Sequence, residues 1–423
     1  MRPARVRLRS VLVVCSLLLF ASPAVAKNKI PKPSKSGIDH IVVVMMENRS
    51  FDHFLGWLPT ADGIQDGLSY PDDETNTSLP TYPLAPDYMG CGHTDPDHTW
   101  EGGRAQYNDG AMDGFLNSGD SDEYAIGYYV EADRPFFSAL ARNFTTCDRF
   151  FASILGPTFP NRIFQHSAQT DRLENTLDFS TLPTIWDRLA EAGVDARYYF
   201  SDASFLWLWG IKYLPIHRTY DQFLADAASG DLPAVSFVEP RFVEDSTGTS
   251  GSDHPFADVR EGDAFLADTF HALSTGPAWG NTVFIVTYDE WGGFFDHVAP
   301  PRAAAPNTVD PDLVANQALL GFRVPVIVAS PFTRGDANAP RVDSTVFDHT
   351  SILKLIEWRW GLAPLTARDA SDDVGNLVDV LDFHKPNARV PALPHPMHPP
   401  FAFCLPPVED EFGLSDLVLI DPR

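Results

Sequence analysis

The chain has 423 residues, a length that fits two or three small domains or one large α/β domain. Apolar residues make up 44% of it and charged residues 21%, which excludes a disordered chain, a collagen and a coiled coil. Its 57 acidic residues outnumber its 31 basic ones, giving a net charge of −26. This sign argues against general binding to nucleic-acid phosphates.

The first 26 residues predict a secretory signal peptide. Basic residues precede an apolar run over residues 11–20, and Ala24-Val25-Ala26 is a small-residue cleavage site. The apolar run is too short for a comfortable membrane span, and a retained anchor is the alternative. We therefore expect export to the periplasm or the extracellular medium. Residues 27–37 are basic and rich in Pro and Ser, and are expected to form a short mobile spacer.

Apolar, β-branched runs alternate with helical patterns after the spacer, which predicts an α/β fold with a mostly parallel sheet. The predicted buried parallel strands are residues 38–46, 196–200, 234–238, 282–288 and 324–329, and the predicted helices are 163–168, 182–192 and 350–360. No composition break divides the chain, so we expect one domain over residues 38–423 with long inserted loops. Residues 386–407 contain eight prolines and should cross the surface without regular structure.

Three cysteines follow the predicted cleavage site. They are Cys91, Cys147 and Cys404, and the sequence does not show which two would form a disulfide.

Polar residues directly follow two of the predicted strands. Glu47 and Asn48 come after the first strand, and Asp289 and Glu290 come after the strand over residues 282–288. Ligands of α/β sheets bind beyond the carboxyl ends of the strands, so these side chains are expected to converge. Four oxygen ligands would suit a divalent ion such as Ca, Mg or Mn, with Zn as an alternative. The competing interpretation is that they are ordinary caps and turn residues.

Thr158 lies in Gly156-Pro157-Thr158-Phe159-Pro160, just before a predicted helix. Free N–H groups at a helix N-terminus favour a phosphate or an alkoxide. The simpler interpretation, taken from this segment alone, is a helix-capping threonine.

Three histidines, His98, His254 and His297, lie in loops flanked by Gly, Pro or Asp rather than on apolar faces. They could contact phosphate oxygens and transfer protons near neutral pH. A single loop histidine is usually only solvated. Asp296 is expected to hold His297 in one tautomer, and His93 is a weaker candidate for the same chemistry.

Six segments in order resemble the bacterial phosphoesterase family that contains phosphatidylcholine-type phospholipases C and a related acid phosphatase. The segments are "MMENRSFDHFLGWLP", "DPDHTWEGG…NDGAMDGF", "GPTFPNR", "SDHPFADVREGDAF", "VFIVTYDEWGGFFDHVAPP" and "DHTSILKLIEWRWG", and they span residues from about 38 to about 360. The resemblance implies an alkaline phosphatase-like fold. The sequence departs from the family pattern at His93-Thr94-Asp95-Pro96. This departure leaves open whether His93 or His98 takes the family's histidine position.

The resemblance also implies site roles. It places Glu47, Asn48, Asp289 and Glu290 at metal-ligand positions and Thr158 at the position of the nucleophile. His98, His254 and His297 fall at phosphate-contacting or proton-transfer positions, and Asn48 and His98 would contact the substrate. The implied reaction is attack by Thr158 on phosphorus, a phospho-threonine intermediate, and hydrolysis by water. His254 or His297 would protonate the leaving alcohol.

The favoured function is therefore a secreted, metal-dependent phosphoesterase of the phospholipase C type. A secreted acid phosphatase acting on monoesters is the alternative enzyme, and an acidic binding protein with a degenerate site is the alternative outside enzymes. The substrate would be a phospholipid or a small phosphate ester, with at most transient contact with a membrane surface. Two aromatic stretches, residues 198–200 and 205–209, could hold a choline group or touch lipid, although core packing is the simpler interpretation.

Overall fold

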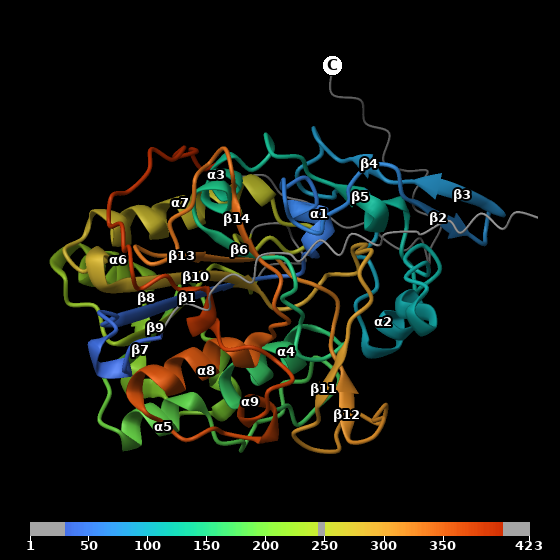
Figure 1. Cartoon of the computed structure of the whole chain (residues 1–423). Coiled ribbons are helices and arrows are strands. Elements are labelled where there is room, and N and C mark those ends of the chain that lie inside the picture. The colour runs from blue at the N-terminus through green and yellow to red at the C-terminus, as the bar shows by residue number, and fades with distance from the viewer. Residues whose placement is uncertain (1–29, 244–249, 401–423) are drawn as a thin grey trace, which may run out of the picture.

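The computed structural model describes residues 30–243 and 250–400. The predicted signal peptide and Cys404 lie outside these residues. The described chain is built on one eight-stranded sheet with the strand order β14-β6-β13-β10-β1-β9-β7-β8 (Figure 1). The strands are β1 (His40–Met46), β6 (Thr145–Cys147), β7 (Ala196–Phe200), β8 (His217–Thr219), β9 (Val235–Glu239), β10 (Thr282–Tyr288), β13 (Val326–Ala329) and β14 (Arg341–Asp343).

Parallel pairing dominates the sheet. Strands β10, β1, β9, β7 and β8 form a continuous parallel block, and β14 is parallel to β6. The carboxyl ends of the block therefore meet at one edge of the sheet. This arrangement confirms the predicted mostly parallel α/β fold.

One predicted parallel strand is in fact antiparallel. Strand β13 lies within the predicted range 324–329, but it pairs antiparallel with both β10 and β6. The error has a physical reason, because a strand that is buried on both faces has the same apolar composition in either direction. Strand β13 is fully buried, like its neighbour β10.

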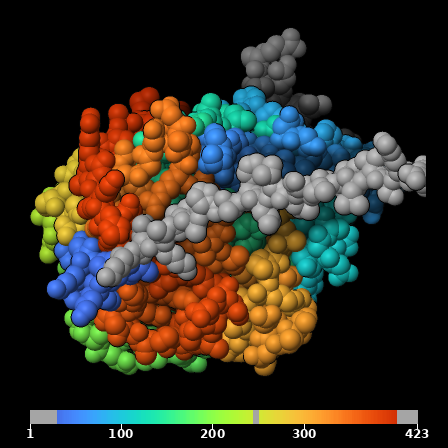
Figure 2. Space-filling model, viewed as in Figure 1, coloured from blue at the N-terminus to red at the C-terminus, as the bar shows by residue number. Residues whose placement is uncertain are grey.

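Helices cover both faces of the sheet. In Figure 1, α3, α6 and α7 lie on one side, and α4, α5, α8 and α9 lie on the other. Figure 2 shows the orange and red part of the chain, which includes α8 and α9, covering the lower part of the visible face. The helices are α1 (Phe51–Leu55), α2 (Trp100–Tyr107), α3 (Pro135–Asn143), α4 (Thr158–Ser167), α5 (Ile185–Glu191), α6 (Tyr220–Ser229), α7 (Val259–Thr275), α8 (His349–Trp360) and α9 (Ala367–Ala370).

Smaller elements extend from the sheet. They are the pairs β2 (Ser69–Asp72) with β3 (Thr77–Pro80), β4 (Tyr82–Pro83) with β5 (Gly127–Tyr128), and β11 (Arg302–Ala304) with β12 (Gln317–Leu319). As predicted, residues 386–400 of the proline-rich segment contain no helix or strand. Its His395 and His398 bind Asp268 on α7.

Two further features bear on the sequence predictions. Cys91 is disulfide-bonded, whereas Cys147 is a free, buried cysteine in β6. Across residues 30–243 and 250–400, no helix combines the length and the apolar character that crossing a membrane would require.

Candidate active site

The site begins where β1 and β10 end. Met46 pairs with Tyr288 in the parallel register, so Glu47 and Asp289 leave the sheet at the same level. The two segments are then joined, because the Asn48 N–H donates to Asp289 Oδ1 over 3.0 Å and the Arg49 N–H donates to the Glu290 carbonyl. All four residues predicted as oxygen ligands are therefore brought to one edge of the sheet, as expected from the strand-end rule.

Thr158 is the first residue of α4, which positions its hydroxyl over these strand ends. Its Oγ1 lies 3.3 Å from Glu47 Oε1 and 3.3 Å from Asn48 Oδ1. The preceding loop is fixed by Asn161, whose amide donates to the carbonyls of Ile154, Gly156 and Pro157. Thr158 therefore lies at a fixed position, because Asn161 in the first turn of α4 holds the loop that precedes the helix.

The predicted cluster of free N–H groups at the start of α4 is largely absent. The Phe159 N–H donates to Asn175 Oδ1 over 2.8 Å, and Pro160 has no N–H to offer. Binding of a phosphate by the helix N-terminus is thus limited to the first residue of the helix. The prediction missed Asn175 because it lies in a loop far from the helix start in sequence.

Arg162 is a buried cation that organises the carboxylates. Its Nε donates to Asp289 Oδ2 over 2.9 Å, its Nη1 to Glu239 Oε1 over 2.8 Å, and its Nη2 reaches Glu47 Oε2 over 3.4 Å. No pattern in the sequence predicted a role for Arg162 or Glu239. Glu239 was within reach of the same reasoning, because it ends β9, the other neighbour of β1 in the sheet.

His98 and Glu290 form a second charged pair beside the threonine. His98 Nε2 lies 3.9 Å from Glu290 Oε1 and 3.3 Å from the Asn48 amide nitrogen. Burial lowers the pKa of His98, but the Glu290 and Asp95 carboxylates outweigh it and raise the pKa to about 9. Burial raises the pKa of Glu290, which His98 counteracts. The pKa values of His98 and Glu290 are both raised, so the pair retains a proton at the polar end of the cavity.

His254 lies on the other side of His98. Its Nε2 is 3.6 Å from Asp95 Oδ2, and its buried Nδ1 has no hydrogen-bond partner. The backbone around it is fixed by Arg49, which donates to the carbonyls of Asp253 and His254. His254 can therefore exchange a proton without breaking a tight ion pair. His93 stacks on Tyr124 and binds Asp122, and it is not among the residues that line the cavity, whereas His98 is.

These residues open onto a cavity of about 650 Å³. Its polar end is formed by Glu47, Asp95, His98, Thr158 and His254. Its remaining wall is mainly apolar and includes Phe159, Phe205, Leu208, Phe242 and Phe256. The arrangement joins a hydroxyl, carboxylates and histidines to a space large enough for an organic ester.

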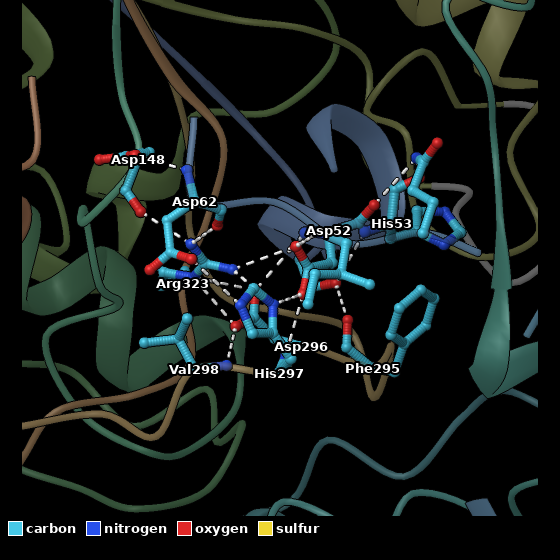
Figure 3. Close-up of polar contacts among 12 residues, drawn as sticks. Asp52, His53, Asp62, Asp148, Phe295, Asp296, His297, Val298 and Arg323 are labelled. Carbon is cyan, nitrogen blue, oxygen red and sulfur yellow. Dashed lines mark hydrogen bonds and ion pairs between the residues drawn. The ribbon is translucent and has the colours of Figure 1, made fainter. Parts of the chain in front are cut away.

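His297 lies elsewhere, in a separate charged cluster at the start of α1 (Figure 3). Its Nδ1 is 2.5 Å from Asp52 Oδ2 and its Nε2 is 3.3 Å from Asp62 Oδ1. Both ring nitrogens are engaged, and His297 is not among the residues that line the cavity. The catalytic role predicted for His297 therefore finds no support in this placement.

The prediction that Asp296 holds His297 is wrong. Asp52 takes that place, while Asp296 accepts hydrogen bonds from Arg323 Nε and from the Val298 N–H. Arg323 also donates to Asp52 over 3.1 Å (Figure 3). Sequence adjacency suggested the pair, but the turn after Phe295 directs Asp296 toward the buried arginine.

Oxygen atoms of the type that divalent cations bind lie around Thr158. Glu290 Oε1 is buried without a hydrogen-bond donor, and Glu47 Oε1 and Asn48 Oδ1 converge on the threonine hydroxyl. Asp289 differs, since its Oδ1 accepts from two N–H groups and its Oδ2 from Arg162. Hard oxygen donors of this kind suit Ca, Mg or Mn.

Among the described residues, two groups of acidic and histidine side chains bring their ligand atoms within 4.8 Å of one another, and neither contains Glu47, Asp289 or Glu290. Asp95, His98 and His254 form one at the cavity, and Asp52, Asp296 and His297 form the other beside Arg323.

Two proteins with similar sequences are named phospholipases C. Phospholipase C B of Mycobacterium tuberculosis is 34% identical, over 85% of this chain and 80% of its own. Non-specific phospholipase C6 of Arabidopsis thaliana is 31% identical, over 79% of this chain and 71% of its own.

Solved structures with a similar arrangement are more distant. A phosphonate monoester hydrolase of Agrobacterium radiobacter matches with a TM-score of 0.37 at 12% identity, over 82% of this chain and 78% of that one. A protein of the alkaline phosphatase superfamily from Vibrio parahaemolyticus matches with a TM-score of 0.36 at 13% identity, over 79% of this chain and 69% of that one.

The family assignment follows from the length of chain that one family model covers. The model of the Phosphoesterase family matches residues 38–363, which include every residue of the site described above. The chain therefore belongs to the Phosphoesterase family and is a hydrolase that acts on phosphoric ester bonds.

Proposed function

We propose that the protein is a secreted, metal-dependent phosphodiesterase of the phospholipase C type that works through a phospho-threonine intermediate. The observation that carries the proposal is the position of Thr158 Oγ1, which lies 3.3 Å from Glu47 Oε1 at the polar end of the cavity. The phospholipase C names of its relatives support the substrate class. The pattern of residues 1–26 supports export.

The first half of the reaction would use Thr158 as the nucleophile. A divalent ion held by Glu47, Asn48, Asp289 and Glu290 would lower the pKa of the hydroxyl and neutralise charge on the phosphate. The Thr158 hydroxyl lies 3.3 Å from both Glu47 Oε1 and Asn48 Oδ1, and Glu47 would take its proton as the attack begins. Attack on phosphorus forms a bond from Thr158 Oγ1 and breaks the bond to the alcohol.

Proton transfer would fall to His254. It lines the cavity beside Asp95 and donates its proton to the departing alcohol oxygen. The same nitrogen then takes a proton from the water that hydrolyses the phospho-threonine, and Glu47 returns a proton to Thr158 Oγ1 as the bond to phosphorus breaks. His98 lies between Asn48 and Glu290, where its N–H can donate to a phosphate oxygen.

The apolar wall favours a diester over a monoester. A monoester could be held by the polar end of the cavity alone, whereas a lipid diester carries a large apolar alcohol. Phe159, Phe205 and Phe256 line the space next to Thr158 where that group would lie. Apolar lining with a few convergent polar groups is typical of sites for such organic ligands.

The test compares Thr158→Ala and Thr158→Ser on a diester, p-nitrophenyl phosphorylcholine, and on a monoester, p-nitrophenyl phosphate. We expect the unchanged protein to prefer the diester in kcat/KM. Thr158→Ala should lower kcat on the diester at least about a thousandfold, because the nucleophile is gone. Thr158→Ser should retain measurable turnover, because it keeps a hydroxyl at the same place.

Two outcomes would contradict the proposal. Full turnover by Thr158→Ala, with an unchanged melting temperature, would exclude Thr158 as the nucleophile. A strong preference for the monoester would instead identify the protein as a phosphatase and leave the nucleophile assignment standing.

A further inference from the structure

Large apolar side chains are exposed around the mouth of the cavity. Leu177, Trp207 and Val243 all line the cavity, yet they are 81%, 47% and 60% exposed. Phe179 follows Leu177 by two residues and is 75% exposed. We call these four residues the apolar rim. Single exposed apolar residues are ordinary, but a group around one opening marks an interaction site.

The apolar rim is supported by buried structure. The Ser180 N–H donates to the Leu208 carbonyl over 2.7 Å, which joins the segment of Leu177 and Phe179 to the segment of Trp207. Trp207 belongs to a 3₁₀ turn, Phe205–Trp209, whose other four side chains are buried. Of the two sequence interpretations, core packing therefore applies to most of this stretch, and Trp207 alone is directed outward.

The same turn is connected to the catalytic groups. The Phe205 N–H donates to Glu239 Oε2 over 3.2 Å, and Glu239 Oε1 accepts from Arg162, which also binds Asp289. Phe205 packs edge-on against Phe159, the residue after Thr158. A molecule held at the apolar rim would thus lie at the opening of the same cavity that Thr158 lines.

The charges next to the apolar rim are acidic. Asp178 lies between Leu177 and Phe179, and Asp202 accepts hydrogen bonds from the N–H groups of Phe242 and Val243. Two basic residues of the same segments are each paired with an acid, Arg241 with Glu261 over 2.9 Å and Lys212 with Asp187 over 2.8 Å. With a net charge of −26, the protein would be repelled by an anionic surface. A zwitterionic phosphocholine surface, whose outermost charge is an ammonium group, fits these acids.

We propose that the apolar rim docks on the surface of an aggregated zwitterionic phospholipid, so that a lipid passes from that surface into the cavity. Leu177, Phe179, Trp207 and Val243 would enter the headgroup region, and the distal ends of the acyl chains would stay in the lipid layer while the part of the alcohol next to the phosphate lies against the apolar wall of the cavity. This proposal rests on the proposed function, since it assigns an aggregated lipid as the physical form of the substrate. It predicts that affinity for the surface and chemistry at Thr158 are separable.

The test measures binding to phosphatidylcholine vesicles by co-sedimentation, with Thr158→Ala as the parent protein so that no lipid is hydrolysed. In that parent, the triple change Leu177→Ser, Phe179→Ser and Trp207→Ser should lower vesicle affinity at least about tenfold, because apolar area that inserts is lost. The matched control changes Val130→Ser and Met397→Ser, which are exposed apolar residues outside the apolar rim. The control should bind like the parent, and adding anionic lipid to the vesicles should weaken binding of both.

A second measurement uses the active protein with Phe179→Ser alone, since Phe179 does not line the cavity. Its rate on p-nitrophenyl phosphorylcholine in solution should be unchanged, whereas its rate on phosphatidylcholine vesicles should fall. Melting temperatures check that each variant is folded.

Three results would overturn the docking proposal. They are equal vesicle binding by the triple variant and the control, binding that requires anionic lipid, and a dimer in solution that the triple variant converts to a monomer. The last result would show that a second copy of the chain covers the apolar rim. Because binding is measured without turnover, these results are independent of whether Thr158 is the nucleophile.

Discussion

Gly292 sets the position of the Asn48 side chain. Asn48 adopts a left-handed backbone with φ 60°, a conformation that Asn tolerates better than most residues. Gly292 has φ 64°, and a Cβ placed on it would lie 2.1 Å from the Asn48 carbonyl oxygen. The close approach lets Glu290 fold back, so that its Oε2 accepts from the Gly292 N–H. The geometry of two predicted metal ligands thus depends on a residue without a side chain.

Gly292→Ala should therefore disturb both stability and activity. We expect the free energy of unfolding to fall by about 2–4 kcal/mol, from the left-handed strain and the backbone clash together. Gly280→Ala is the matched control, because a Cβ at Gly280 meets open space. Chemical denaturation and kcat measured well below the melting temperature provide the two readouts. Equal stability of the two variants would show that the loop adjusts at no cost.

At the residue scale, chain position predicted which oxygen-bearing side chains meet at the sheet edge better than it predicted their partners. Glu47, Asn48, Asp289 and Glu290 each follow a strand end, and Thr158 begins a helix, so a local rule finds them. Arg162 was missed because its function depends on three carboxylates from separate strands. A buried guanidinium is stable only with such partners, and no local pattern in the sequence shows them.

At the scale of single elements, α8 carries a buried acid that is independent of the catalytic site. Burial, and next the Asp369 carboxylate, raise the pKa of Glu357 to about 9. Asp369 is fixed by the N–H groups of Leu365 and Thr366, so Glu357 is the partner that keeps a proton. The pKa of Glu357 is higher in the folded state than in the unfolded state. Glu357 therefore makes its full contribution to stability at pH values below its unfolded-state pKa. That contribution is lost as the pH rises toward about 9.

Glu357→Gln should consequently flatten the dependence of stability on pH. The variant should gain melting temperature relative to the unchanged protein at about pH 8, and gain little at about pH 5, where Glu357 is already protonated. Glu101→Gln, at an exposed position on α2, is the control and should show the same difference at both pH values. The measurement is the melting temperature of each variant at the two pH values. A Glu357→Gln variant that is less stable at the higher pH would mean that the glutamate is ionised there.

The long buried strands were predicted and the short strands were not, and among the helices the prediction omitted α7 although it has 17 residues. Strands β7 and β10 have the predicted bounds, and α8 differs from its prediction by one residue. Strands β6, β8 and β14 were not predicted, since three residues are too few to show a period. The direction of β13 depended on its partners and not on its own composition.

At the scale of the whole molecule, the site forms where the sheet edge, α4 and the Phe205–Trp209 turn meet. The sheet edge supplies the carboxylates, α4 supplies Thr158, and the turn supplies the apolar wall. The sequence predicted the first two as separate features of an α/β fold. It did not predict the cavity between them, because the loops that close it pack only through long-range contacts.

Phosphorylation of Thr158 during turnover is the claim on which the account depends most. The most direct measurement is acid quenching of the protein within its first turnovers of p-nitrophenyl phosphorylcholine, followed by mass spectrometry of the peptides. We predict one phosphoryl group on the peptide that contains Thr158, located on the threonine, and none when the metal has first been removed by a chelator. A phosphoryl group on another residue, or an unmodified Thr158 while the protein is turning over, would contradict the account.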